Sequence, residues 1–333
     1  MKKFINAPAA YVDEMLEGIY AAHPDELGYT AGDLRCVIRK NIKDKVTLMS
    51  GGGSGHMPLF MGYVGQGLLD GCAVGGVFQS PSAEQMLEVT KAINRGKGVL
   101  YVYGNYTGDI INFEMATEMA EMDNIRTVHV LGADDVASAP KGEEHKRRGV
   151  AGIFFVFKAA GAAAEEVASL DEVKRIAEKA AASVRTMGVA LSPCIIPEVG
   201  KASFSIGEDE MEIGMGIHGE PGINRSRLEP VDIVVKKMMD KILEDMPLSR
   251  GSEVSVLMNS LGATPKDELY IAYRQVDKIL KSLGVKVFHV YAGEFATSME
   301  MAGFSISVCK LDDELRRLLS KPARTPFFEQ VQL

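Results

Sequence analysis

Short apolar runs with the length of strands alternate with amphipathic segments of helical period along most of this chain. In the first half, strand-like runs at 45–49, 72–78, 99–103 and 126–131 are separated by helix-like segments at 11–24, 83–94 and 112–122. Strand patterns that alternate with helix patterns are typical of α/β proteins, whose parallel or mixed sheets are covered by helices. The sequence therefore predicts an α/β fold.

The pattern changes at Gly149 and then resumes, which indicates a second domain. Residues 149–187 are rich in alanine and predict two helices that meet near Ser169, where SLDE predicts a capping box. Strands are then expected at 188–196, 210–217, 254–259, 285–291 and 304–310, and helices at 229–246, 265–283 and 311–320. We therefore predict two α/β domains, residues 1–185 and 186–333, each a mixed β-sheet flanked by helices.

The charge balance and the cysteines limit the class of protein. The formal net charge is -8, whereas a general nucleic-acid binder needs a basic surface. The one dense basic run, at 146–148, is interpreted as the solvated start of a helix. Four separated cysteines show no metal-binding or redox spacing, and no apolar run is long enough to span a bilayer. We expect a cytoplasmic protein that binds neither nucleic acid nor membranes.

Residues 210–222, EMEIGMGIHGEPG, place a histidine at the end of a predicted strand. Apolar residues alternate with glutamate and glycine over 210–217, and a turn rich in glycine and proline follows. His218 would then lie on a stiff turn with no bulky neighbours, where an imidazole is accessible enough to react. The dinucleotide-binding fingerprint is excluded because it requires a helix after the glycines. A histidine that only hydrogen-bonds the turn is the alternative interpretation.

The segment SGGGSGH, residues 50–56, follows the strand predicted at 45–49 and is rich in glycine. Residues without a Cβ allow backbone N–H groups to converge on a ligand. The segment is not a Walker A loop, because no Gly-Lys-Ser/Thr follows it closely. We interpret it as a ligand-binding loop with His56 at its end, and a tight strand-to-helix turn is the alternative.

Two further loops follow strands and are expected at the same edge of the sheet. Asp109 lies in one of them, GNYTGD, and Ser80 and Ser82 lie in the other, SPS. Ligands of open α/β sheets bind at the carboxyl ends of the strands, although each of these side chains could instead cap the following helix. We find neither a hydrolase elbow nor a zinc pattern, and the spacing of the two histidines and the aspartate gives no support for a metal. These residues indicate a small polar ligand and one nucleophilic or basic histidine.

The motifs as a set resemble the substrate-binding subunit of dihydroxyacetone kinase. They are SGGGSGH (50–56), SPS (80–82), NYTGD (105–109), RRGVAG (147–152), GIHGEPGI (216–223) and NSLGATP (259–265). They occur in the order of the family, with near-matching spacing, from the N-terminus to about residue 328. The resemblance implies two α/β domains in a homodimer of glycerol metabolism that holds a short-chain ketose, while a separate helical subunit or domain holds the nucleotide.

Carried over by position, the resemblance gives each site residue a role. His218 would attack the ketose carbonyl and form a hemiaminal, which selects ketoses over polyols such as glycerol. Asp109 would accept the proton of the hydroxyl group that is phosphorylated, and His56 would hydrogen-bond the substrate beside it; phosphoryl transfer depends on such positioning. The substrate-binding set that the resemblance implies also contains three loop residues, Gly53, Ser80 and Gly104.

The resemblance also implies what other molecules supply. No second nucleotide-binding domain follows residue 328, so ADP or ATP and Mg²⁺ are expected on a helical partner subunit of the DhaL type. We expect no cofactor and no metal on this chain. ATP and a phosphotransferase relay both remain open as the phosphoryl donor.

Two positions depart from the pattern of the family. Met57 replaces a glutamate that is common after the glycine loop, and Gly104 replaces a lysine that contacts the substrate. Loss of the lysine is expected to leave space for a larger substrate, such as a four-carbon ketose. It also leaves a second function open, a ketose-sensing paralogue that acts as coactivator of a transcription regulator. Retention of His56 and Asp109 favours the enzyme, a phosphotransferase of the dihydroxyacetone (glycerone) kinase type that requires its partner.

Overall fold

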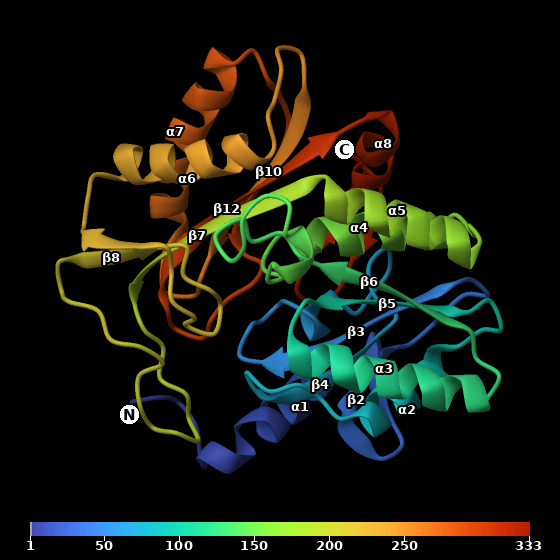
Figure 1. Ribbon diagram of the computed structural model, residues 1–333. Coiled ribbons are helices and arrows are strands. Elements are labelled where there is room, and N and C mark those ends of the chain that lie inside the picture. Colours follow the sequence, from blue (N-terminus) through green and yellow to red (C-terminus); the bar gives the residue numbers. More distant parts are fainter. Residues whose placement is uncertain (1) are drawn as a thin grey trace.

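The computed structural model describes residues 2–333 and contains a first six-stranded sheet in the order β1-β2-β4-β3-β5-β6 (Figure 1). Strands β4, β3, β5 and β6 run parallel, and β1 and β2 are antiparallel at one edge. The bounds of these strands are β1 Leu27–Thr30, β2 Asp33–Arg39, β3 Thr47–Ser54, β4 Gly71–Val77, β5 Val99–Gly104 and β6 Thr127–Gly132.

A second six-stranded sheet has the order β11-β10-β12-β7-β8-β9. Strands β10 and β11 are parallel, and the other neighbours are antiparallel. The bounds of these strands are β7 Val184–Ser192, β8 Glu210–Ile213, β9 Asn224–Arg227, β10 Glu253–Ser260, β11 Lys286–Glu294 and β12 Ala302–Leu311. A two-stranded ribbon, β13 (Ala323–Arg324) with β14 (Glu329–Gln330), closes the chain.

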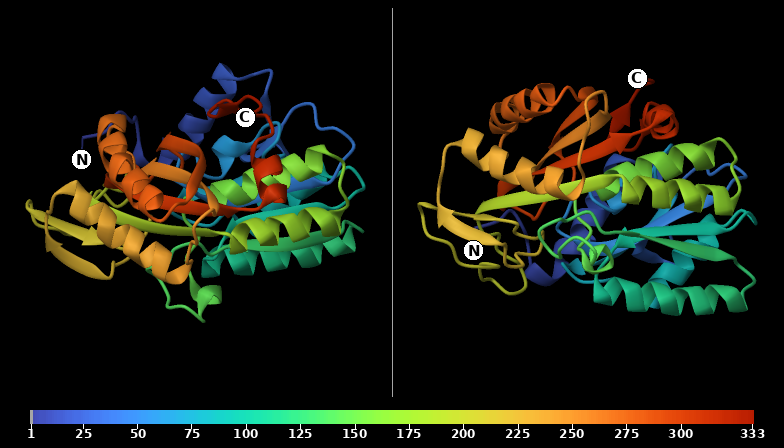
Figure 2. Two further views of the ribbon diagram at one scale, coloured as in Figure 1. Left: turned by 90° about the horizontal axis from the view of Figure 1, so that it is seen from above. Right: turned by 45° about the horizontal axis from the view of Figure 1, so that its top comes forward.

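Helices cover both sheets. Helices α2 and α3 pack on one face of the first sheet and α4 and α5 on the other, while α6 and α7 pack on the second sheet (Figures 1 and 2). The bounds of the α-helices are α1 Tyr11–Ala22, α2 Ala83–Ile93, α3 Thr107–Met122, α4 Ile153–Glu165, α5 Leu170–Ala182, α6 Val231–Asp245, α7 Lys266–Ser282 and α8 Asp313–Leu319. Three short 3₁₀ helices are η1 Pro8–Ala10, η2 Met61–Tyr63 and η3 Glu144–Lys146. The predicted fold class, α/β with mixed sheets flanked by helices, is confirmed.

Helix α4 is apolar apart from Lys158 and its last residue, Glu165, because it lies between the two halves of the molecule. Every residue from Ile153 to Ala164 is buried, as expected for a helix that has no solvent face. It contacts β3 and β5 of the first sheet and also α8, so one hydrophobic core extends across both halves. The predicted boundary after residue 185 falls within the start of β7, where the chain passes from α5 into the second sheet. The division into domains stays a prediction.

Several predicted elements differ from the structure at the loops that concern function. Strand β3 continues through the glycines to Ser54, and α3 begins at Thr107, five residues before its predicted start. Strand β8 ends at Ile213 rather than at residue 217. Strands β1, β2 and β9 were not predicted. Strands β1 and β9 have only four residues each, and β2 carries charged residues among its apolar ones.

The interpretation of the basic run as a solvated helix start is wrong. Arg147 is 1% exposed and forms a bidentate ion pair with Asp245, at 2.6 and 2.9 Å. Arg148 pairs with Asp135 at 2.7 Å. The two arginines are therefore structural partners of buried carboxylates rather than a charged surface. Within residues 2–333, we find no helix that combines the length and the apolar character needed to cross a bilayer.

Candidate functional site

The glycine segment is a strand with very close neighbours. A Cβ on Gly52 would lie 2.4 Å from the Phe60 ring, and a Cβ on Gly53 would lie 2.7 Å from the backbone nitrogen of Gln79. Glycine is required here because the following loops pack directly on the backbone of β3. This packing brings Gly53 and His56 to the wall of one small cavity of about 10 Å³. A contact of Gly53 with substrate stays a prediction.

His56 is held by the second half of the chain. Its Nδ1 lies 2.7 Å from the carbonyl oxygen of Thr297, and since a carbonyl only accepts, Nδ1 carries the proton. The Nε2 atom of His56 is buried and has no hydrogen-bond partner. Burial, with the nearby charge of His218, lowers the pKa of His56 to about 3. His56 is therefore neutral at pH 7, with a free acceptor nitrogen.

The loop that carries His56 and the loop that carries Thr297 are joined by five hydrogen bonds. Besides the imidazole bond, the Thr297 N–H donates to the His56 carbonyl at 3.2 Å, and the Thr297 hydroxyl lies within donating distance of two carbonyls, that of Met57 at 2.9 Å and that of Gly55 at 3.4 Å. The Met299 N–H donates to the Gly55 carbonyl at 2.8 Å. We call this set of bonds the loop–loop contact. It fixes His56 relative to the second sheet.

His218 is oriented by a carboxylate two residues later. Its Nδ1 lies 3.0 Å from Oε1 of Glu220, and its backbone N–H donates to Oε2 at 3.0 Å. Burial raises the pKa of Glu220, but hydrogen bonding and charge from His218, together with Arg148, outweigh it and lower this pKa to about 2. An ionised carboxylate only accepts, so Nδ1 of His218 carries a proton. In neutral His218 the lone pair therefore lies on Nε2.

Three aromatic rings surround the imidazole of His218. The ring centroids of His56 and Tyr106 each lie 4.8 Å from that of His218, and the centroid of Phe78 lies 5.3 Å away, all in edge-to-face contact. Phe78 also stacks on His56 at 4.7 Å. The His218 side chain nevertheless stays 25% exposed. The two histidines predicted from separate motifs thus meet at one site, and His218 remains open to a ligand.

Asp109 lies in the first turn of α3, and its interpretation as the helix cap is wrong because Tyr106 occupies that position. Its side chain is 7% exposed, and Oδ1 has no hydrogen-bond partner. Burial raises the pKa of Asp109 to about 6, against the opposing effects of the Ser80 hydroxyl and the His218 charge. A buried carboxylate with an unused oxygen and a pKa near neutrality is suited to accept a proton.

The remaining predicted residues lie around this site. Ser80 accepts a hydrogen bond from the Asn112 amide at 3.3 Å, whereas Ser82 is the cap of α2 and forms a capping box with Gln85. The expectation of open space beside Gly104 is wrong. A Cβ on Gly104 would lie 2.9 Å from two ring carbons of Tyr106, so the tyrosine fills that space.

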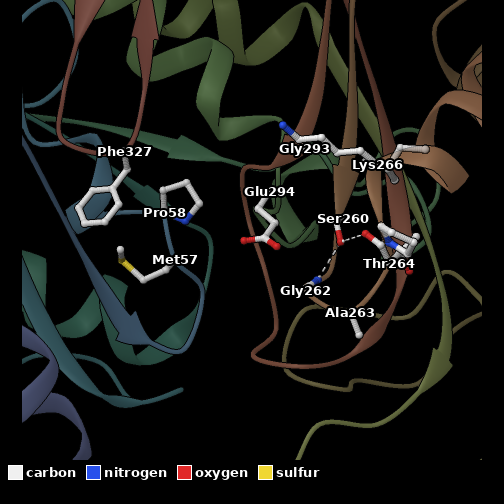
Figure 3. Close-up of a pocket in the computed structure, with 12 residues that line it drawn as sticks. Met57, Pro58, Ser260, Gly262, Ala263, Thr264, Lys266, Gly293, Glu294 and Phe327 are labelled. Atoms are coloured by element: carbon white, nitrogen blue, oxygen red, sulfur yellow. Dashed lines mark hydrogen bonds between the residues drawn. The ribbon is translucent and has the colours of Figure 1, made fainter. Parts of the chain in front are cut away.

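A cavity of about 800 Å³ lies apart from the two histidines (Figure 3). It lies between the two halves, with Met57 and Phe327 on one side and Glu294 and Lys266 on the other. The hydroxyl of Ser260 in its wall already donates to the Thr264 carbonyl at 2.7 Å. Neither histidine of the site lines this cavity, so its size says nothing about the ketose.

Sequence reasoning missed four side chains that organise the site. They are Phe78, Tyr106, Arg148 and Glu220. Glu220 and Tyr106 stand inside motifs that the sequence singled out, two residues after His218 and three before Asp109, and only their role as supports was overlooked. Phe78 could not be found, because it reaches the site through a left-handed backbone turn with φ of 58°. Among residues 2–333 we find no group of three or more His, Cys, Asp and Glu side chains placed to hold a metal ion.

Comparison with known proteins agrees with these motifs. The profile of the Dak1 domain matches residues 17–327. A Listeria innocua protein named PTS-dependent dihydroxyacetone kinase 2, dihydroxyacetone-binding subunit DhaK, is 48% identical over 331 residues, which are 99% of each chain.

Two solved structures are also similar. The dihydroxyacetone kinase of C. freundii superposes with a TM-score of 0.91 at 31% identity, and all of this chain spans 61% of that longer one. The dihydroxyacetone kinase operon co-activator DhaQ gives a TM-score of 0.86 at 32% identity, over 93% of this chain and 96% of its own. The chain therefore belongs to the Dak1 domain family.

Proposed function

We propose that this protein is the ketose-binding subunit of a dihydroxyacetone-type kinase and holds a short-chain ketose as a hemiaminal on His218. The observation that carries the proposal is the pairing of His218 Nδ1 with the ionised carboxylate of Glu220 at 3.0 Å. This pairing leaves the lone pair on Nε2, the nitrogen that can attack a carbonyl carbon. The name of the Listeria innocua relative, a dihydroxyacetone-binding subunit, supports the same ligand class.

The adduct step follows from this arrangement. Nε2 of His218 forms a bond to the carbonyl carbon, the C=O π pair moves to the oxygen, and that oxygen takes a proton from water. The hydroxide that remains takes a proton from the imidazolium, which leaves a neutral hemiaminal. The negative charge of Glu220 offsets the positive charge that develops on the imidazole, in the way a buried carboxylate supports a catalytic histidine. A polyol such as glycerol has no carbonyl carbon and cannot form this bond.

The bound ketose would then be phosphorylated at a hydroxyl group. The free Oδ1 of Asp109 would accept the proton of that hydroxyl, and the free Nε2 of neutral His56 would accept a hydrogen bond from the substrate. Both groups are buried acceptors without a partner, which a substrate hydroxyl would satisfy. Their retention favours a catalytic over a purely sensing role.

A nucleotide-binding helical subunit of the DhaL type would supply ADP or ATP with Mg²⁺. The word PTS-dependent in the name of the relative favours a phosphotransferase relay over free ATP as the donor. We further propose that the protein is a cytoplasmic homodimer. Size-exclusion chromatography with light scattering tests the dimer.

Intact-protein mass spectrometry tests the adduct directly. The protein is incubated without reductant with dihydroxyacetone, erythrulose or glycerol. We expect a mass increase of one ketose molecule, none with glycerol, and none in His218→Ala. The control His145→Ala replaces an exposed histidine and should keep the adduct. A wild-type protein that gains no mass with either ketose would contradict the proposal.

A second candidate function is a ketose-sensing coactivator, which the likeness to the co-activator DhaQ favours. The two functions differ after the adduct has formed. Adding a helical nucleotide-binding subunit with ATP, or with ADP and a phosphotransferase relay, gives ketose phosphate from the enzyme. A sensor forms the adduct and gives no product with either donor.

A further inference from the structure

Tyr106 is anchored at both ends beside Gly104. Its backbone N–H donates to the Gly104 carbonyl at 2.8 Å, and its hydroxyl donates to the Gly149 carbonyl at 3.1 Å. The ring between these anchors lies over the Cα of Gly104, where a Cβ would approach Cδ2 and Cε2 to 2.9 Å. Real Cβ atoms do not come this close, so a side chain at position 104 has to displace a ring that is held on two sides.

The same ring contacts the residue that carries the adduct. Tyr106 meets His218 edge-on, with centroids 4.8 Å apart and planes at 85°. Its carbonyl accepts from the Ile110 N–H at 3.0 Å and so begins α3, whose first turn holds Asp109. Tyr106 therefore connects the orientation of the His218 ring to the position of Asp109.

We propose that Gly104 and Tyr106 form a positioning pair that selects the size of the ketose at His218. Gly104 admits the tyrosine ring, and the ring fixes the plane of His218 and fills the space on that side of it. The site therefore takes a three-carbon ketose in preference to a four-carbon one. This inference rests on the proposed function and names its substrate class.

The backbone offers no competing reason for the glycine. Gly104 does not have the positive φ that disfavours other residues, so alanine fits the local backbone. The nearest other atom to an added Cβ is the Gly149 carbonyl oxygen, at an ordinary contact distance of 3.6 Å. The effect of Gly104→Ala is therefore predicted to act through the Tyr106 ring.

A double-mutant cycle tests this coupling. The concentration of dihydroxyacetone or erythrulose that gives half of the maximal mass adduct is measured for wild type, Gly104→Ala, Tyr106→Ala and the double variant. Gly104→Ala should raise the value for dihydroxyacetone about tenfold in the wild-type background, because misplaced reacting groups lose much of their effective concentration. The same change should have an effect below about twofold in the Tyr106→Ala background, where no ring has to move. Tyr106→Ala should shift the preference toward erythrulose.

The double-mutant cycle has a control variant, and its outcomes separate a failure of this inference from a failure of the proposed function. Gly18→Ala, in α1 with no atom within 4 Å of the added Cβ, should behave as wild type. Equal effects of Gly104→Ala in both backgrounds, or no effect at all, would overturn the inference while the wild-type adduct still supports the proposed function. If the wild type forms no adduct, the proposed function fails instead. NMR of labelled histidine then tests the geometry alone, since displacing the Tyr106 ring must shift the His218 ring resonances and unchanged resonances would refute it.

Discussion

Arg148 donates a hydrogen bond from Nη2 to the backbone carbonyl of Gly214 at 3.1 Å, which joins the segment before α4 to the loop that carries His218. The same guanidinium donates from Nε to Asp135 at 2.9 Å and lies 3.8 Å from Glu220. It is 14% exposed. One arginine of the first half thus contacts the loop of His218 in the second.

We expect Arg148→Met to weaken both the fold and the adduct. Removing one partner of a buried ion pair costs about 3–5 kcal/mol, because the other charge stays buried. The unpaired carboxylate would be Asp135, whose pKa burial raises to about 6 even with Arg148 beside it. Urea unfolding should therefore show a larger loss at pH 8, where Asp135 must ionise, than at pH 5. Arg148→Lys keeps the charge and should recover part of the stability; an equal loss at both pH values would contradict this account.

Glu220→Gln is expected to lower adduct formation while the fold is kept. Glutamine has the size of glutamate but no negative charge, so it cannot offset positive charge on His218. An amide can also donate to Nδ1, which would move the His218 proton to Nε2 and block the nucleophile. We expect at least about a tenfold rise in the half-saturating ketose concentration, measured by mass spectrometry. Glu198→Gln, at an exposed carboxylate, serves as the control.

His56→Asn should retain the adduct and lose turnover. The asparagine amide can replace the Nδ1 donor toward the Thr297 carbonyl but offers no acceptor at the place of Nε2. Loss of such a group typically lowers rates by about 10²–10⁴-fold. Mass spectrometry measures the adduct, and an assay with the partner subunit measures turnover. A His56→Asn variant with full turnover would show that His56 has no role in the reaction.

The stability of His56→Asn should also depend on pH differently from that of the wild type. Burial lowers the pKa of His56 to about 3, below its ordinary value of 6.5. The folded state therefore resists protonation of His56. The contribution of this group to the free energy of unfolding is fully present above pH 6.5 and is lost as the pH drops from 6.5 toward 3. We expect His56→Asn to lose less stability over this interval in chemical unfolding experiments.

Asp109→Asn is expected to abolish turnover and to stabilise the protein at pH 7. Burial raises the pKa of Asp109 from 3.8 to about 6, so ionisation favours the unfolded state as the pH rises between these values. The difference in pKa corresponds to a gain of about 3 kcal/mol in the unfolding free energy of Asp109→Asn at pH 7, reduced by any local hydrogen bonds that the variant loses. The gain in unfolding free energy should disappear below pH 4. For wild type, turnover should rise as the pH increases through about 6.

The sequence predicted the architecture because the signals for it are local. Helices such as α5, capped by Ser169 through the Glu172 N–H, follow from periodicity and capping within a few residues. The pairing of His218 with His56 was reached only through resemblance, since the two lie in loops of different halves. Periodicity within each half contains no information about that contact.

What could not be predicted depends on side-chain contacts that the periodicity of the sequence does not encode. Gly104 was expected to leave a space, whereas the structure fills it with a side chain two positions later. Arg147 and Arg148 were interpreted as solvated because no local pattern reveals their partners. Arg147 pairs with Asp245, far later in the chain, and Arg148 pairs with Asp135, which precedes it. The close approach of the Phe60 ring and the Gln79 backbone to the glycines of β3 is a further contact of this kind.

The loop–loop contact limits how far the two halves of the chain can move relative to each other. Five hydrogen bonds between the loops at Gly55–Met57 and Thr297–Met299 would all have to break for the two halves to swing apart. Because the core around α4 is also shared by both halves, we expect the chain to respond to a ligand as one rigid body. Small-angle X-ray scattering should therefore give the same radius of gyration with and without ketose, and any opening that admits the ligand is confined to the loop around His218.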